Sequence, residues 1–218
     1  MDSPSALVPG PIARTLLELA ERGASGEIAI GGRKLVLHEG QVIGVLPAPG
    51  DEPLDSFLVK AGRLDDGGAR AARSKSEMAG TPLIRELELV LTPAQLTQGL
   101  RALWLDRLVF GLQSDVDAGQ GLNDFEPAAA LSTRAGEHRT PLLELLLDAL
   151  ARRAGERDAG LVGSQANKLL IWQESSHRAA AEAWAELPAL DPPRVARLLA
   201  SSPAAASRIA ALLRAGLV

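Results

Sequence analysis

Residues 27–46 contain three short apolar segments separated by two turns, Gly31-Gly32 and Glu39-Gly40. Two-residue turns with glycine supply the positive φ that a tight antiparallel hairpin requires, so this stretch predicts a three-stranded β-meander. One face of the sheet is expected to be apolar and to consist of Ile28, Ile30, Leu35, Leu37, Val42 and Leu46. A three-stranded sheet with a single apolar face is only marginally stable, so helices must cover it.

The helices expected around this sheet begin at capping residues that are followed by proline, a pair suited to a helix start. Such pairs are Thr81-Pro82, Thr92-Pro93, Thr140-Pro141, Asp191-Pro192 and Ser202-Pro203. Thr92 has Gln95 at the capping-box spacing, which predicts a long helix from there to Phe110. Its buried face is expected to carry Leu96, Leu100, Leu103, Trp104, Arg107 and Leu108. A first helix is predicted over residues 11–22 and is expected to pack on the sheet.

The second half of the chain changes in composition. Residues 113–139 are rich in Gly, Asp, Ser and Asn, which predicts a connection with a short strand near Phe125. Residues 140–153 have leucine on most sides of a predicted helix, which indicates burial between two surfaces. The predicted fold class is α+β, with a small antiparallel β-meander covered by helices and then an all-helical C-terminal part. The expected domains are residues 10–112, a connection over 113–139, and a helical part over 140–218.

Composition excludes several classes of site and makes some classes of partner less favoured. The 218 residues include no cysteine, which excludes disulfides, thiolate catalysis and Cys-ligated metal centres. A net charge of −4 gives no overall attraction to nucleic-acid phosphates or anionic lipid. No apolar run reaches the roughly 18 to 20 residues of a membrane span, and the first ten residues lack the pattern of a signal peptide. We therefore expect a cytoplasmic protein without membrane contact.

No motif for catalysis, a cofactor or a metal is present. The histidines His38, His138 and His177 have no second ligand at helical spacing, so they are expected at the surface. The acidic pairs Asp51-Glu52 and Asp65-Asp66 stand at expected helix starts, where free amides and the helix dipole favour negative charge. Capping is the preferred interpretation of these pairs over acid–base catalysis. We expect a protein that is not an enzyme and has no catalytic, cofactor-binding or metal-binding residues.

The C-terminal segment gives two interpretations. Residues 191–218 resemble a helix-turn-helix of the winged kind and are locally basic, with Arg208 and Arg214 on the second part. The segment offers mostly alanine for base contacts, and no wing is expected, so packing or partner binding is favoured over DNA readout. Trp172 and Trp184 are interpreted as core residues or as anchors for a partner. Trp172, Trp184, Arg208 and Arg214 are the candidate partner-binding residues.

A family resemblance rests on short motifs spread over residues 10–112. These are Leu16-Leu17, Gly26-Glu27-Ile28-Ala29-Ile30, the segment from Leu37 to Val42 around Gly40, the segment from Leu54 to Gly62-Arg63-Leu64, and the segment from Pro82-Leu83 to Leu91-Thr92. The pattern resembles the bacterial PATAN domain, and the hairpin part is also similar to the N-terminal regulatory domain of type II secretion and type IV pilus ATPases. The resemblance implies a helix, a small meander and paired helical hairpins.

The same resemblance implies a non-catalytic module of bacterial signalling, motility or cell polarity, with response regulators or small Ras-like GTPases as partners. The expected function is therefore a protein-interaction adaptor or regulator, and self-association of the chain is a further expectation. The alternative is a DNA-binding transcriptional regulator that uses residues 191–218. Nucleic acid is the less favoured partner.

Overall fold

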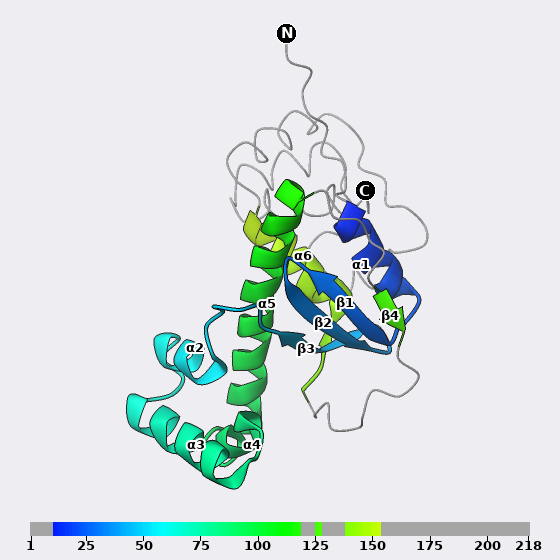
Figure 1. Cartoon of the computed structure of the whole chain (residues 1–218). Coiled ribbons are helices and arrows are strands. Elements are labelled where there is room, and N and C mark those ends of the chain that lie inside the picture. Colours follow the sequence, from blue (N-terminus) through cyan, green and yellow to red (C-terminus); the bar gives the residue numbers. More distant parts are fainter. Residues whose placement is uncertain (1–10, 119–124, 128–137, 154–218) are drawn as a thin grey trace, which may run out of the picture.

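The computed structural model describes residues 11–118, 125–127 and 138–153 (Figure 1). The elements in chain order are α1 (Pro11–Glu21), β1 (Gly26–Ile30), β2 (Arg33–His38), β3 (Gln41–Leu46), α2 (Leu54–Lys60), α3 (Asp66–Ala79), α4 (Leu83–Glu88), α5 (Pro93–Ala118), β4 (Phe125–Pro127), β5 (Thr140–Pro141) and α6 (Leu142–Arg153). The α+β class predicted from the sequence is confirmed, as is the meander over β1, β2 and β3.

The sheet is antiparallel and has the strand order β4-β1-β2-β3-β5. The meander forms its centre, and a short strand from the second half of the chain pairs with each side. The strand predicted near Phe125 is β4, which pairs with β1. Strand β5 pairs with β3 through Thr140 and Pro141. The sheet therefore joins segments that lie about a hundred residues apart.

The prediction for the apolar face of the meander is confirmed except at its last residue, Leu46. Leu46 is 48% exposed, whereas Val45 is 5% exposed and belongs to the core. The cause is a β-bulge, because Val36 pairs with Gly44 while the next residue of β2 pairs with Val42. Ile43 is the extra residue, and it moves every later side chain of β3 to the opposite face.

Helix α5 begins as predicted. Thr92 Oγ1 accepts a hydrogen bond from the Gln95 backbone N–H at 3.3 Å, and Gln95 Oε1 accepts one from the Thr92 N–H at 3.0 Å. This reciprocal pair is a capping box. The helix continues to Ala118, eight residues past the predicted end. Its predicted inner stripe, including Trp104 and Arg107, is buried.

Helices α1, α5 and α6 pack together, and α5 also contacts β1 and β3. The leucines of α6 are buried against α1 and α5, so the predicted burial between two surfaces is confirmed and both surfaces belong to this chain. The predicted helix start at Thr140-Pro141 is wrong, because both residues pair with β3 and α6 begins at Leu142. The pair Thr81-Pro82 is displaced by one position, since Pro82 occupies the N-cap of α4. The pairs at 191–192 and 202–203 lie outside the described residues.

Candidate interaction surface on the helical arm

Helices α2, α3 and α4, with the turn that follows α4, form a unit that we call the helical arm, residues 54–90. Figure 1 shows the arm at one end of α5, away from the sheet, while the other part of α5 runs beside the sheet and α6. The helices of the arm pack on one another, and α2 and α4 contact α5. Leu58 and Leu87 are fully buried at these contacts and extend the core into the arm.

The helices of the arm pack closely because small residues lie at their contacts. Helix α3 buries only the small residues Ala69 and Ala72, and Asp65 caps its start by accepting the Gly68 N–H at 2.7 Å. The capping role predicted for the pair Asp65-Asp66 is therefore confirmed at Asp65. On α5, Gly99 lies against Leu58, and a Cβ at position 99 would collide with Leu58 Cδ2. Small residues thus let α2 and α3 pack closely, and the outer face of α3 remains exposed to solvent.

An open groove of about 530 Å³ runs between α2 and α3. Charged side chains dominate its walls, with Lys60 from α2 and Arg70 and Arg73 from α3. Asp55 lies beneath Arg73 and is only 1% exposed. Arg73 Nε donates to Asp55 Oδ2 at 2.8 Å, while the Arg73 side chain itself is 49% exposed. The buried carboxylate therefore holds a half-exposed guanidinium at the groove.

The arm also exposes large apolar side chains. Met78 at the end of α3 is 79% exposed, Leu89 after α4 is 77% exposed, and Val90 is half exposed. Leu46 and Phe110 are the other exposed large apolar residues of the described part, and Phe110 packs under the Arg33 guanidinium at 5.7 Å. The arm therefore carries most of the exposed large apolar side chains in the described residues, a property common at protein-binding surfaces.

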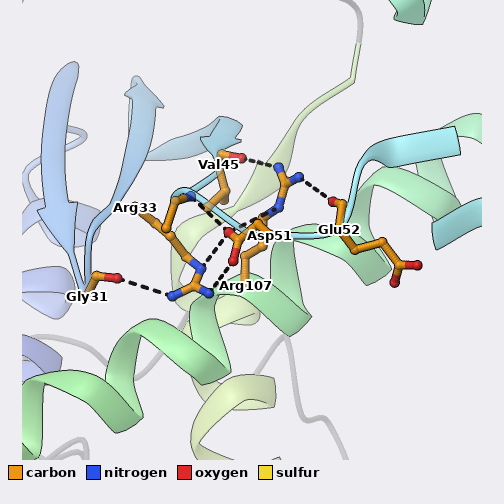
Figure 2. Close-up of polar contacts among 7 residues, drawn as sticks. Gly31, Arg33, Val45, Asp51, Glu52 and Arg107 are labelled. Atoms are coloured by element: carbon orange, nitrogen blue, oxygen red, sulfur yellow. Dashed lines mark hydrogen bonds and ion pairs between the residues drawn. The ribbon is translucent and has the colours of Figure 1, made fainter. Parts of the chain in front are cut away.

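A charged cluster fixes the segment from which the arm departs. Figure 2 shows Arg33 of β2 and Arg107 of α5 directed at Asp51, which lies in the connection between β3 and α2. Arg33 Nε donates to Asp51 Oδ2 at 2.9 Å, and the Ala48 N–H donates to the same oxygen at 3.0 Å. Arg107 donates to the carbonyls of Val45 at 2.6 Å and Glu52 at 3.1 Å. The cluster ties the sheet, α5 and the base of the arm together.

The predicted role of Asp51-Glu52 as a helix cap is wrong. Pro53 occupies the N-cap of α2, and no side chain donates or accepts a capping hydrogen bond there. Asp51 is instead a nearly buried counter-charge for two arginines. Burial by itself would raise the pKa of Asp51, but hydrogen bonds from Arg33 and the Ala48 N–H, and the charges of Arg33 and Arg107, hold it below its ordinary value.

The cluster predicts an acid-sensitive fold. Because the pKa of Asp51 is lower in the folded state, the ionised carboxylate stabilises the fold. This stabilisation is fully present above the unfolded pKa, about 3.9, and is lost as pH falls through the folded pKa. We expect the free energy of unfolding to decline below about pH 4, measured by urea denaturation at a series of pH values. An Asp51→Asn variant should have a shallower decline over this range. An unchanged pH profile in that variant would contradict the assignment.

His138 is buried, so its predicted surface location is wrong. Its Nδ1 lies 2.7 Å from Thr97 Oγ1 of α5, and its Nε2 lies 3.8 Å from a carboxylate oxygen of Glu88 at the end of α4. The ring therefore fills the junction between the arm, α5 and the start of β5. Arg101 makes a second junction on α5, donating to both Glu144 and Asp148 of α6.

The four candidate partner-binding residues predicted from the sequence, Trp172, Trp184, Arg208 and Arg214, lie outside the described residues, as does His177. The surface that the structure does describe was not singled out from the sequence. A signal for it exists, because Arg70, Arg73 and Lys75 stand close together on an alanine-rich helix with little apolar surface of its own. Such a helix presents a charged face unless another chain covers it.

Within residues 11–118, 125–127 and 138–153, no group of three or more His, Asp and Glu side chains is placed to hold a metal ion. None of the helices described there has the length and apolarity needed to cross a bilayer. Comparison of the chain with protein-family models, with curated proteins and with solved structures found no match.

Proposed function

We propose that this chain is a non-catalytic protein-interaction adaptor or regulator that binds its partner through the helical arm. The observation that carries the proposal is the exposure of Met78, Leu89 and Val90 on an arm that projects from the sheet. Burying one large apolar side chain in an interface contributes about 1.5–3 kcal/mol, so these residues can supply much of a binding energy. The charged cluster around Asp51 supports the proposal, because it holds the base of the arm in one orientation.

The proposed setting is the cytoplasm of a bacterium, in signalling, motility or cell polarity. Its basis is the sequence resemblance to the PATAN domain, whose partners include response regulators and small Ras-like GTPases. The order of elements in residues 11–88, a helix, a meander and then three further helices, supports this part of the proposal. Partners of this kind would meet the outer surface of the arm.

Placing a photo-crosslinking amino acid at Leu89 or Met78 of the full chain tests this function. We expect both positions to crosslink one and the same partner in cells, identified by mass spectrometry as a receiver-domain protein, a small GTPase or a motility component. Nuclease treatment should leave the products unchanged. Arg14, exposed on α1, is the control position and should give no such product. Nuclease-sensitive recovery of DNA would instead favour the alternative regulator that reads DNA through residues 191–218.

A single substitution at the exposed apolar surface tests whether the arm is needed for binding. Leu89→Asp should abolish capture of the partner identified by crosslinking, because it places a charge in the proposed apolar interface. Leu89 is exposed, so the variant should unfold within about 0.5 kcal/mol of the parent protein in urea. Capture that survives this substitution at full strength would contradict binding through the arm.

A further inference from the structure

The groove between α2 and α3 is lined by an arginine whose position is fixed by a buried carboxylate. Arg73 is fixed on one side by Asp55, which is 1% exposed, and its Nη2 also donates to Ser56 Oγ at 3.3 Å. Burying a carboxylate is costly unless it is paired with a cation. The buried carboxylate of Asp55 is paired with Arg73, and the guanidinium of Arg73 also lines the groove. A guanidinium held in place loses little conformational entropy when it binds a ligand.

The groove offers free donors beside this arginine. Arg70 uses only its Nε, which donates to the backbone carbonyl of Asp66 at 3.1 Å. Within the described part of the chain, neither terminal nitrogen of Arg70 nor Nη1 of Arg73 has a hydrogen-bond partner. Arg70 and Arg73 are three residues apart on α3, so both guanidiniums lie on the side of the helix that lines the groove.

Lys60 adds a third cation from the opposite wall. Its ammonium pairs with Glu52 at 2.6 Å, but the lysine side chain is exposed, and exposed ion pairs contribute about 0–1 kcal/mol. A ligand anion can therefore take the place of Glu52 at small cost. Of the two carboxylates that line the groove, Asp55 is already neutralised by Arg73, which leaves Asp66 at the exposed start of α3. Taken together, the lining side chains carry three positive charges against two negative charges, a net charge of +1.

We propose that this groove binds an oxyanion, a carboxylate or phosphoryl group, carried on an acidic segment of the partner protein. Arginine donors arranged in a fork match the planar or tetrahedral oxygen atoms of these groups, and Ser56 and Lys60 provide donors from the facing wall. The proposal rests on the proposed function, because it identifies the chemistry of the partner segment that meets the arm. Met78 and Leu89 would supply the apolar part of the same interface.

Titration of the isotopically labelled full chain, followed by NMR, tests the groove directly. The probes are inorganic phosphate, a glutamate-rich peptide, the same peptide with phosphoserine, and a glutamine-rich control peptide. We expect the backbone signals of Ser56, Lys60, Arg70 and Arg73 to shift with the anionic probes and not with the glutamine peptide. The tighter of the two anionic peptides identifies carboxylate or phosphoryl as the preferred group.

Two variants with the same change in charge make the test specific. Arg70→Ala should weaken binding of the anionic peptides about tenfold, because it removes one charge-assisted contact. Lys75→Ala removes a cation from the same helix outside the groove lining and should change affinity less than twofold. Arg70 is exposed, so its loss should not unfold the chain.

Equal weakening by the two variants, or the absence of groove shifts with every anion, would overturn the oxyanion site. Binding of duplex DNA in the groove without binding of either acidic peptide would overturn it as well. The proposed function fails in a different way. If crosslinks from Leu89 persist while Arg70→Ala has no effect on peptide binding, the adaptor function stands and the groove inference falls.

Discussion

Replacing Asp51 with alanine is expected to lower the free energy of unfolding by about 3 kcal/mol or more, a value typical of removing one partner from a buried ion pair. The carboxylate accepts from Arg33 and from the Ala48 N–H, and it faces Arg107 at 3.9 Å. Without it, two nearly buried guanidiniums repel one another with no counter-charge. The Arg107 side chain is only 10% exposed, and this burial lowers the pKa of its guanidinium.

Chemical denaturation followed by circular dichroism measures this loss. Glu77→Ala is the control, because it removes the same charge from an exposed position on α3 and should change stability by less than about 0.5 kcal/mol. Asp51→Ala should also loosen the connection between β3 and α2, seen as faster amide hydrogen exchange in residues 47–53. A loss below about 1 kcal/mol would show that the cluster is a minor contributor to stability.

Leu58→Ala is expected to cost about 3 kcal/mol, because Leu58 is fully buried where α2 meets α5 and its loss leaves a cavity. The arm should respond more strongly than the sheet. We expect hydrogen exchange to accelerate in α2, α3 and α4, while β1 and β2 keep their protection. Uniform acceleration over all described elements would mean that the arm and the sheet unfold as one unit and would contradict this expectation.

A double-mutant cycle checks the cause. Gly99→Ala alone should destabilise the chain by about 1–3 kcal/mol, since the added Cβ collides with Leu58 Cδ2. In the Leu58→Ala background the added methyl group enters the new cavity. The loss of stability in the double variant should therefore be about 1 kcal/mol smaller than the sum of the two single losses. Strict additivity would mean that the two residues do not share a packing site.

Local patterns determined much of the fold. The glycine turns specify the meander, because a two-residue hairpin needs positive φ at its centre, and Gly31, Gly32 and Gly40 all adopt it. The spacing of Thr92 and Gln95 determined the start of α5, because the capping box is formed by residues three apart. The leucines of residues 142–150 predicted burial on two sides, which needs no knowledge of the neighbours. Each of these signals is complete within a few residues.

The remaining features depend on contacts between distant segments. The bulge at Ile43 exchanges Leu46 for Val45 in the core, and only the pairing of β3 with β2 decides it. The sequence predicts that Asp51 caps a helix, but the fold brings Arg33 and Arg107 to it from 18 and 56 residues away. The pairing of Asp55 with Arg73 likewise spans 18 residues. Sequence periodicity reports which face of an element is buried, but a charge's partner is set by tertiary packing. The meander, the capping box of α5 and the buried leucines therefore follow from the sequence alone, whereas the charged cluster and the groove of the arm exist only in the folded chain.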